Sequence, residues 1–420
     1  MAEQHKGPDS PFTLEELALR DDLPAEQKVP DDVRAGLASN RVTVTVPPGQ
    51  QLAPSTGGTL TLPEGSFYGC AVKEARLHER GSLRAPDGPQ QAARPMWQPY
   101  LHHPRPAPVR RLEMRRIKGG TVTPFAGPVY GEYPPRQVFY PRGYPWVCIG
   151  RIFVWRDISA PNWDYSGTGV LAGARTVLTA SHVVPWGSTH WGAKFVAGYY
   201  DGASTAGPGG WSWVTDAHGY GPQNVSAHDM AVFRLDTPLG NQLGWFGTKG
   251  WDSSWEGRNY WTLVGYPGAV SPERPSYQAA IHVIDTDTDS DARELEHHAD
   301  AGPGDSGGPF FGQWSDGAYA IGTLSGYEVI HGPLGIGSED NNISAGGNAL
   351  GASSSSDGTT GRERRTSVSG RLDLVAGDAD RVVVQAVTGG EVEALLEEGE
   401  ATKGRPWWVR SGPGRGRRRR

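Results

Sequence analysis

The chain has 420 residues and a formal net charge of −6, and 37% of its residues are hydrophobic. The 59 glycines and 34 prolines indicate a turn-rich, all-β protein with room for a large core and flanking regions. The negative charge argues against general nucleic-acid binding, and no apolar run approaches the ~18 residues that cross a membrane. We therefore expect neither a nucleic-acid nor a membrane partner.

Residues 1–125 are rich in Pro, Gly, Glu and Arg, and we expect a pro-region or a loosely ordered extension there. Within it, Thr13 followed by Glu16 has the pattern of a capping box, which predicts a short helix. The start of the chain has no apolar core of signal-peptide length, so secretion is not supported by the sequence itself. The two cysteines, Cys70 and Cys148, either pair and tether the extension or remain free thiols.

Two predicted strands further along the chain each carry a titratable side chain near one end. A short β-branched apolar run, 176–178, predicts a buried strand that ends just before His182. A second apolar strand is predicted within 227–235, and Asp229 lies at its mouth. A histidine and an acid at strand ends are candidates for a general base and its partner.

The turn 304–309 carries the candidate nucleophile, Ser306. Its glycines let the backbone fold tightly, so that the N–H groups of Gly304 and Ser306 point to one spot where an oxyanion would form. The same pattern fits the nucleophile elbow of α/β-hydrolases, which requires a helix next and a histidine after a downstream acid. Glycine and proline follow here and only His331 remains downstream, so the elbow is disfavoured.

The three candidates occur in the order His, Asp, Ser, with spacings of 229 − 182 = 47 and 306 − 229 = 77 residues. This order fits a double β-barrel in which both barrels contribute to one cleft. Three motifs resemble those of chymotrypsin-like serine proteases: 179–182, 228–232 and 304–309. Three further segments are similar to the bacterial and fungal branch that includes the glutamyl endopeptidases: 144–146, 166–171 and 264–268.

The resemblance covers about residues 140–350 and implies two packed six-stranded antiparallel β-barrels with the active site in the cleft between them. It also implies the site residues. Ser306 would be the nucleophile, His182 the general base and then acid, and Asp229 the buried partner that fixes the imidazole tautomer. Gly304 and Ser306 would supply the oxyanion donors, and the family needs no cofactor or metal.

Substrate preference depends on four further residues that the resemblance places near the primary pocket. Asp300 lies where trypsin-like enzymes carry the acid that attracts Lys or Arg, although acidic residues also occur near this place in glutamyl endopeptidases. Leu324, Ser325 and Gly326 match the strand that lines the pocket and pairs with the substrate, and Ser325 matches the serine that supports the catalytic acid. Leu324 stands where glutamyl endopeptidases have a histidine, so glutamate specificity is not expected.

Residues 115–120 resemble the activation site of trypsin-like zymogens, with Ile117 as the new terminus and its amine paired with Asp305. Ile117 lies 182 − 117 = 65 residues before His182, which is longer than usual. A cut nearer Val129, or a basic loop that is never cut, is equally consistent. If cleavage activates the protein, a chain starting at Ile117 is more active than the full chain.

Metal binding is disfavoured at His228 and at residues 285–296. Adjacent side chains at a strand end point to opposite sides, so we expect His228 to face away from the site if Asp229 faces it. Residues 285–296 imitate an EF-hand loop, but Ser290 stands where glycine is needed and the preceding residues 279–284 alternate like a strand. An acidic turn between two strands is preferred, and calcium binding remains the alternative.

The predicted domains are the extension 1–125, a protease domain 126–350, a Gly/Ser linker 351–365, and a small extension 366–420 with a basic tail. The predicted function is a serine endopeptidase that acts on proteins or peptides as a monomer and is made as a zymogen if the activation site is used. The alternative is a catalytically silent binding protein with a protease fold. The family is commonly secreted, but localisation stays open.

Overall fold

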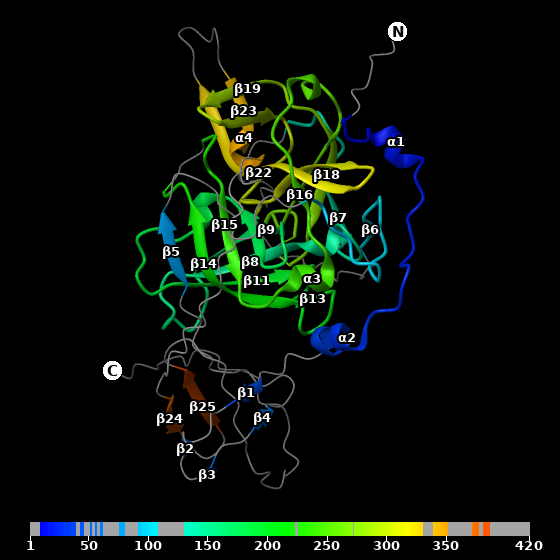
Figure 1. Cartoon of the computed structure of the whole chain (residues 1–420). Coiled ribbons are helices and arrows are strands. Elements are labelled where there is room, and N and C mark those ends of the chain that lie inside the picture. Colours follow the sequence, from blue (N-terminus) through cyan, green and yellow to red (C-terminus); the bar gives the residue numbers. More distant parts are fainter. Residues whose placement is uncertain are drawn as a thin grey trace, which may run out of the picture.

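The computed structural model of the chain is shown in Figure 1. It describes residues 9–38, 75–79, 91–107, 130–222, 226–271, 273–330 and 339–351. Short strands are also described: β1 (Thr43–Thr45), β2 (Gln51–Leu52), β3 (Ser55–Thr56), β4 (Thr59–Thr61), β24 (Leu372–Gly377) and β25 (Arg381–Ala386). None of the helices in these parts of the chain is long and apolar enough to cross a membrane.

Six antiparallel strands close a first barrel. They are β8 (Ile149–Trp155), β9 (Tyr165–Leu171), β10 (Thr176–Thr179), β11 (Gly192–Ala197), β14 (Trp211–Gly219) and β15 (Ala231–Leu235). The pairing order is β11-β8-β9-β10-β15-β14, and β14 pairs back with β11, so the sheet has no free edge at this point. A further strand, β5 (Arg76–Glu79), pairs in parallel with β14, and β12 (Tyr199–Tyr200) and β13 (Ala203–Ser204) form a small hairpin.

A second antiparallel sheet follows in the chain. Its six central strands are β17 (Trp261–Gly265), β18 (Ser276–Ile281), β20 (Ala292–His297), β21 (Pro309–Trp314), β22 (Gly317–Ile330) and β23 (Glu339–Gly347), in the order β20-β23-β22-β21-β17-β18. The ends of this sheet meet, because Ile284 N donates to Glu296 O (2.8 Å) and Glu296 N donates to Asp285 O (3.1 Å). The predicted all-β fold with two antiparallel barrels is confirmed.

Shorter elements complete the second sheet and the connections. The strands are β6 (Arg105–Pro106), β7 (Gln137–Tyr140), β16 (Gly247–Thr248) and β19 (Thr286–Asp289). The helices are α1 (Leu14–Ala18), α2 (Asp31–Ala38), α3 (Leu239–Leu243) and α4 (Asn348–Gly351), with 3₁₀ turns η1 (Trp146–Cys148), η2 (Ser181–Val183) and η3 (Ser253–Trp255). The predicted capping box is present at α1, where Thr13 Oγ1 accepts from Glu16 N (3.1 Å) and Glu16 Oε2 accepts from Thr13 N (2.8 Å).

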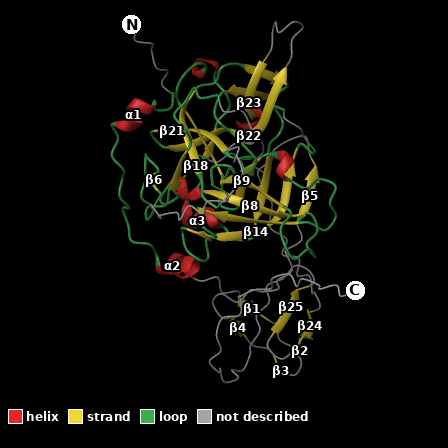
Figure 2. Cartoon of the chain, turned by 180° about the vertical axis from the view of Figure 1, so that it is seen from behind, coloured by secondary structure: helices red, strands yellow, loops and turns green. Residues whose placement is uncertain are grey.

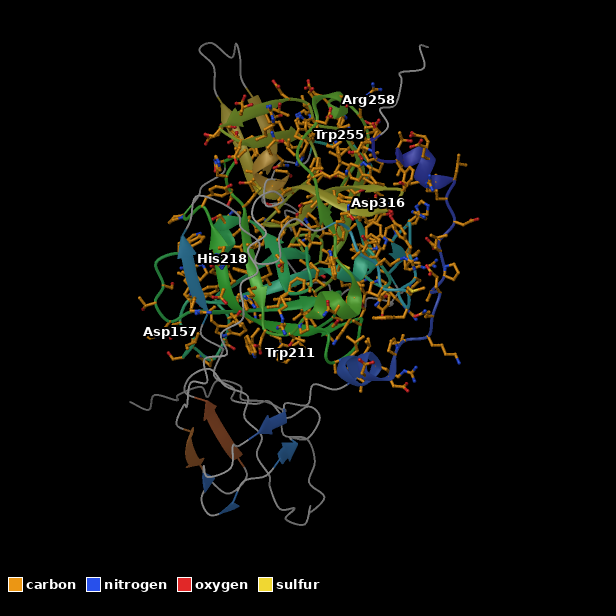
Figure 3. The ribbon with its side chains drawn as sticks, viewed as in Figure 1. Asp157, Trp211, His218, Trp255, Arg258 and Asp316 are labelled. Carbon is orange, nitrogen blue, oxygen red and sulfur yellow. The ribbon has the colours of Figure 1, made fainter. Side chains whose placement is uncertain are left out.

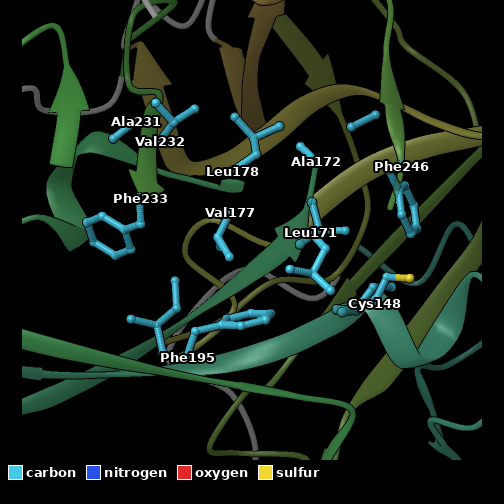
Figure 4. Close-up of a cluster of buried hydrophobic side chains, with 14 of the residues drawn as sticks. Cys148, Leu171, Ala172, Val177, Leu178, Phe195, Ala231, Val232, Phe233 and Phe246 are labelled. Carbon is cyan, nitrogen blue, oxygen red and sulfur yellow. The ribbon is translucent and has the colours of Figure 1, made fainter. Parts of the chain in front are cut away.

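Each barrel has an apolar interior. In the first, alternate residues of neighbouring strands point inward, and Figure 4 shows Val177, Phe195 and Phe233 converging there. In the second, Trp261 and Phe310 are completely buried.

The acidic segment that imitates an EF-hand loop forms a β hairpin. Strand β19 pairs with β20 from Thr286 opposite Leu295 to Asp289 opposite Ala292, and Ser290 in the turn has a positive φ of 57°. The preferred interpretation of an acidic turn between two strands is confirmed.

The described part of the predicted N-terminal extension packs against both barrels. Phe12 N donates to Gln313 O of β21 (2.8 Å), and Gly209 N, beside β14, donates to Leu37 O of α2 (3.0 Å). Figure 2 shows the chain between α1 and α2 running along one side of the two sheets. The predicted boundary between the extension and the protease domain, at residue 125, stays a prediction. Residues 352–365 of the predicted linker lie outside the described residues.

Cys148 is a free and fully buried thiol in the first barrel. Its Sγ lies 3.6 Å from the Leu243 carbonyl oxygen, and burial raises the pKa of the thiol well above its usual value. Cys70 lies outside the described residues. The sequence left open a Cys70–Cys148 disulfide or two free thiols, and Cys148 is a free thiol in the structure.

Candidate active site

His182 and Asp229 are brought together by the pairing of two strands of the first barrel. β10 pairs with β15 so that Thr179 lies opposite Ala231, and each candidate lies a few residues beyond this pair. Asp229 is completely buried; its Oδ2 lies 2.6 Å from His182 Nδ1, and its Oδ1 accepts from His182 N (2.9 Å). An ionised carboxylate can only accept, so Nδ1 carries a proton and Nε2 is left as the basic nitrogen.

The carboxylate of Asp229 is also held by the second barrel. Ser325 of β22 donates its hydroxyl to Asp229 Oδ2 (2.5 Å), and Ser325 is itself buried. Asp229 therefore accepts hydrogen bonds from both barrels, which fixes its orientation at their junction. The structure places Ser325 next to the acid, where the resemblance predicted it.

The turn that carries Ser306 requires glycine at two positions. Gly304 has a φ of 104° and Gly307 a φ of 78°, both in the region that side chains disfavour. A Cβ on Gly304 would lie 2.3 Å from the Tyr266 carbonyl oxygen, and one on Gly307 would lie 2.1 Å from Thr179 Oγ1. No other residue fits at either position without moving the backbone.

One residue of the first barrel fastens this turn, and sequence reasoning missed it. Thr168 of β9 donates its backbone N–H to Ser306 O (2.8 Å) and its hydroxyl to Gly304 O (2.7 Å). Within the described part of the chain, the amides of Gly304 and Ser306 have no hydrogen-bond acceptor of their own. These two N–H groups are therefore available to an external oxygen.

Ser306 and His182 line the same pocket, which has a volume of about 160 Å³. The other lining residues are Arg156, Tyr165, Ser166 and Val183. The imidazole is 33% exposed, so it is accessible from this space. No hydrogen bond joins the Ser306 and His182 side chains among the contacts of the described residues, and such bonds often tighten only when a substrate is bound.

Asp305 forms an ion pair with Arg136 in the interior of the protein. Arg136 Nη2 lies 3.0 Å from Asp305 Oδ1, and the two side chains are 1% and 0% exposed. Arg136 also donates to Ser276 Oγ (3.0 Å) and to Asp300 O (2.8 Å), while Gly302 N donates to Asp305 Oδ2 (3.1 Å). The guanidinium thus connects the start of β7 to the segment that precedes Ser306.

Burial dominates the electrostatics of this pair. It raises the pKa of Asp305 to about 6, although the positive charge of Arg136 opposes the rise, and it lowers the pKa of Arg136. The predicted pairing of the Ile117 amine with Asp305 requires a cut before Ile117, and Ile117 lies outside the described residues. In the uncut chain, the partner of Asp305 is Arg136. No local pattern marked Arg136, because its partner lies 169 residues further along the chain.

Asp300 and Leu324, the remaining predicted pocket residues, are both buried. Asp300 is 4% exposed and is held by Gln278, which accepts from Asp300 N (2.7 Å) and donates to Asp300 Oδ2 (3.0 Å). Its Oδ1 is buried without a partner among the described residues. Leu324 packs in the core of the second barrel, and Gly326 follows Ser325 on β22, opposite Ile343.

His228 points away from the His182–Asp229 pair, as expected. Its ring contacts the acidic hairpin instead, with Nδ1 3.1 Å from Asp289 Oδ2 and Nε2 3.5 Å from Asp291 Oδ1. Across the described residues, no group of three or more His, Cys, Asp or Glu side chains is arranged to hold a metal ion.

Residues 155–336 match the family model described as Trypsin. A search of curated proteins found no significant match to the sequence. Among solved structures, the fold is similar to three proteases. The first is a Glu endopeptidase in complex with MPD, with a TM-score of 0.38, 19% identity, and coverage of 50% of this chain and 89% of that chain.

The second is protease Anisep from Arthrobacter nicotinovorans, with a TM-score of 0.37 and 20% identity over 52% of this chain and 97% of that one. The third is the thermostable serine protease AL20 from an extremophilic microorganism, with a TM-score of 0.37 and 18% identity over 49% and 94%.

The two antiparallel barrels have the chymotrypsin-like fold. The match to the Trypsin family model covers residues 155–336, which is less than half of the chain. The resemblance to chymotrypsin-like serine proteases that the sequence motifs indicated is therefore confirmed.

Proposed function

We propose that this protein is a serine endopeptidase that cleaves peptide bonds through an acyl-enzyme on Ser306. The observation that carries the proposal is the position of the basic nitrogen of His182. The ring is held by Asp229 through Nδ1 (2.6 Å), and the same histidine lines one pocket with Ser306. A hydroxyl and an oriented base that share a pocket are the parts that nucleophilic catalysis requires.

The reaction would proceed in two halves. Ser306 Oγ attacks the substrate carbonyl carbon while His182 Nε2 takes the hydroxyl proton, and the amides of Gly304 and Ser306 donate to the resulting oxyanion. His182 then returns the proton to the leaving amine as the C–N bond breaks. In the second half, water attacks the ester, His182 again takes and returns a proton, and Ser306 is released. Asp229 holds the imidazole throughout.

The alternative of a catalytically silent binding protein is less well supported. A binding role does not require a buried carboxylate that accepts two hydrogen bonds from one histidine and a third from Ser325. Nor does it require two free amides beside a serine hydroxyl. The endopeptidase proposal uses each of these contacts.

Proteolysis by the purified chain would test the proposal directly. We expect the full chain to cut a heat-denatured protein into peptides, with new amino termini that mass spectrometry identifies as internal cleavage sites. The control is the same preparation pretreated with a fluorophosphonate, which should be inactive. An untreated preparation that leaves the denatured protein intact over hours would contradict the proposal.

We also propose that cutting the chain at Ile117 is not required for activity. In the trypsin-like scheme a new amino terminus would neutralise Asp305, and here the Arg136 guanidinium already pairs with Asp305, with both partners buried. A chain that starts at Ile117 should have a kcat no higher than that of the full chain. It should also melt at a lower temperature, because it lacks the contacts of Phe12 and of Leu37 with the barrels. A clearly higher kcat for the shorter chain, measured on one peptide, would restore the zymogen hypothesis.

We propose that Asp300 makes the protein prefer substrates with Lys or Arg as the residue just before the cleaved bond. Its buried and unpaired Oδ1 would be satisfied by a cationic side chain. We expect peptides with arginine to be cleaved roughly 10- to 100-fold faster, in kcat/KM, than peptides with the neutral isostere citrulline. In Asp300→Asn this ratio should approach one, whereas the exposed control Glu256→Gln should keep it. An unchanged ratio in Asp300→Asn would remove Asp300 from this role.

A further inference from the structure

The pocket that His182 and Ser306 line is also bordered by residues at the ends of two strands of the first barrel. Two of its walls come from consecutive strands, since Arg156 directly follows β8 and Tyr165 and Ser166 begin β9. Its volume of about 160 Å³ is close to the ~150 Å³ that holds a benzene molecule in an engineered cavity. The space therefore fits a single side chain.

No carboxylate lines this pocket, and Arg156 and Ser166 bring donor groups to it. The Arg156 guanidinium lies 5.2 Å from the centre of the Tyr165 ring, and the salt bridges of the described residues do not include it. The two nearest acids in the sequence are not paired with the Arg156 guanidinium. Asp164 Oδ2 accepts from Arg156 N (2.7 Å), and Asp157, labelled in Figure 3, accepts from Ser159 N and Oγ.

Ser166 supplies a second donor. Its Oγ accepts from Arg151 Nε (3.2 Å) and from Arg151 Nη2 (3.1 Å). A hydroxyl has two lone pairs and one hydrogen, so its O–H remains free to donate. Arg151 itself is paired with Glu273, with Nη1 2.9 Å from Oε1. Arg156 and Ser166 line one small space, and a guanidinium and a hydroxyl that can both donate favour a carboxylate ligand.

The pocket lies on the leaving-group side of Ser306. The leaving amine must be next to His182, because that histidine protonates it. Val183, which follows His182, lines the pocket, whereas Gly304, Ser325 and Gly326 do not. A side chain in this space therefore belongs to the part of the substrate that follows the cleaved bond.

We infer that this pocket binds an acidic side chain at the first or second residue after the cleaved bond, and that Arg156 is the residue that selects it. The inference rests on the proposed endopeptidase function. Arg156 is exposed, so the selectivity is an exposed ion-pair effect of about fivefold in kcat/KM at low salt and decreases as salt is added.

The test compares two quenched peptides built around a bond that the protein is found to cleave, with Glu or Gln at the two positions after it. The wild-type protein should cleave the Glu peptide about fivefold faster in kcat/KM. Arg156→Gln should lose this preference, and Arg156→Glu should favour a Lys peptide instead. Arg234→Gln, at an exposed arginine on β15, is the matched control and should behave like wild type. Fluorophosphonate labelling of Ser306 should be equal in all four proteins.

Three results would overturn the inference, and they are distinguishable. Equal cleavage of the two peptides by the wild-type protein, or a preference that persists in Arg156→Gln, rejects the acidic subsite while labelling shows the endopeptidase site to be intact. The wild-type protein could instead prefer only peptides that end in a free α-carboxylate at one of these two positions, and not the same peptides as C-terminal amides. That result would assign the pocket to the carboxyl terminus of a substrate. If Ser306 is not labelled and no peptide is cleaved, the endopeptidase function is rejected, and the subsite is rejected with it.

Discussion

Replacing Asp229 by asparagine should lower kcat about 10⁴-fold without unfolding the protein. The carboxylate accepts from His182 Nδ1 (2.6 Å) and so keeps the proton on that nitrogen. An asparagine amide can instead donate to Nδ1, which moves the ring proton to Nε2 and leaves no base for Ser306. The measurement is kcat on a peptide substrate, with the melting temperature recorded to confirm folding.

Ser325→Ala provides the graded comparison for this variant. It removes one donor to Asp229 Oδ2 but leaves both contacts of Asp229 with His182, so its loss of kcat should be much smaller than that of Asp229→Asn. Equal losses in the two variants, or a near-normal kcat in Asp229→Asn, would mean that Asp229 does not set the tautomer.

Replacing Arg136 by methionine should lower the free energy of unfolding by about 3–5 kcal/mol, the usual effect of leaving a buried charge without its partner. Asp305 is completely buried and has only Gly302 N and Arg136 as polar contacts at its carboxylate among the described residues. Urea unfolding at pH 7 measures the effect. A loss below about 1 kcal/mol, the range of exposed pairs, would show that the pair is not buried in solution.

The pH dependence of the free energy of unfolding shows whether the Arg136–Asp305 pair stabilises the fold or only positions residues 302–306. The folded pKa of Asp305, about 6, lies above the ordinary value of 3.8, so ionising the carboxyl costs folding free energy. Its stabilising contribution is present below the unfolded pKa and is lost as pH rises through 6. The neutral double variant Arg136→Met/Asp305→Asn should therefore gain stability relative to wild type over this range. We expect it to remain folded but to have a lower kcat, because residues 302–306 lose their anchor.

Much of the candidate site could be predicted because its motifs are local. His182, Asp229 and Ser306 each stand in a recognisable strand end or turn, and the glycines around Ser306 follow from backbone geometry. The structure brings His182 and Asp229 into contact and places Ser306 in the same pocket as His182, which no single motif could show.

The residues that sequence reasoning missed act over long separations. Arg136 meets Asp305 across 169 residues, and Thr168 meets Gly304 across 136. An arginine before a short strand and a threonine within one are common in any β protein, so neither carries a local signal. The packing of Phe12 and Leu37 on the barrels was missed for the same reason, since isolated apolar residues in a Pro- and Gly-rich stretch show no periodicity.

The most direct test of the central claim is covalent labelling of Ser306. A fluorophosphonate reacts with serines that are activated by a neighbouring base, and tryptic mass spectrometry locates the adduct. We expect one adduct per chain on Ser306 in the uncut wild-type protein, no adduct in Ser306→Ala, and strongly slowed labelling in Asp229→Asn. An adduct on another serine, or an unlabelled wild-type protein that is folded, would contradict the assignment of Ser306 as the nucleophile.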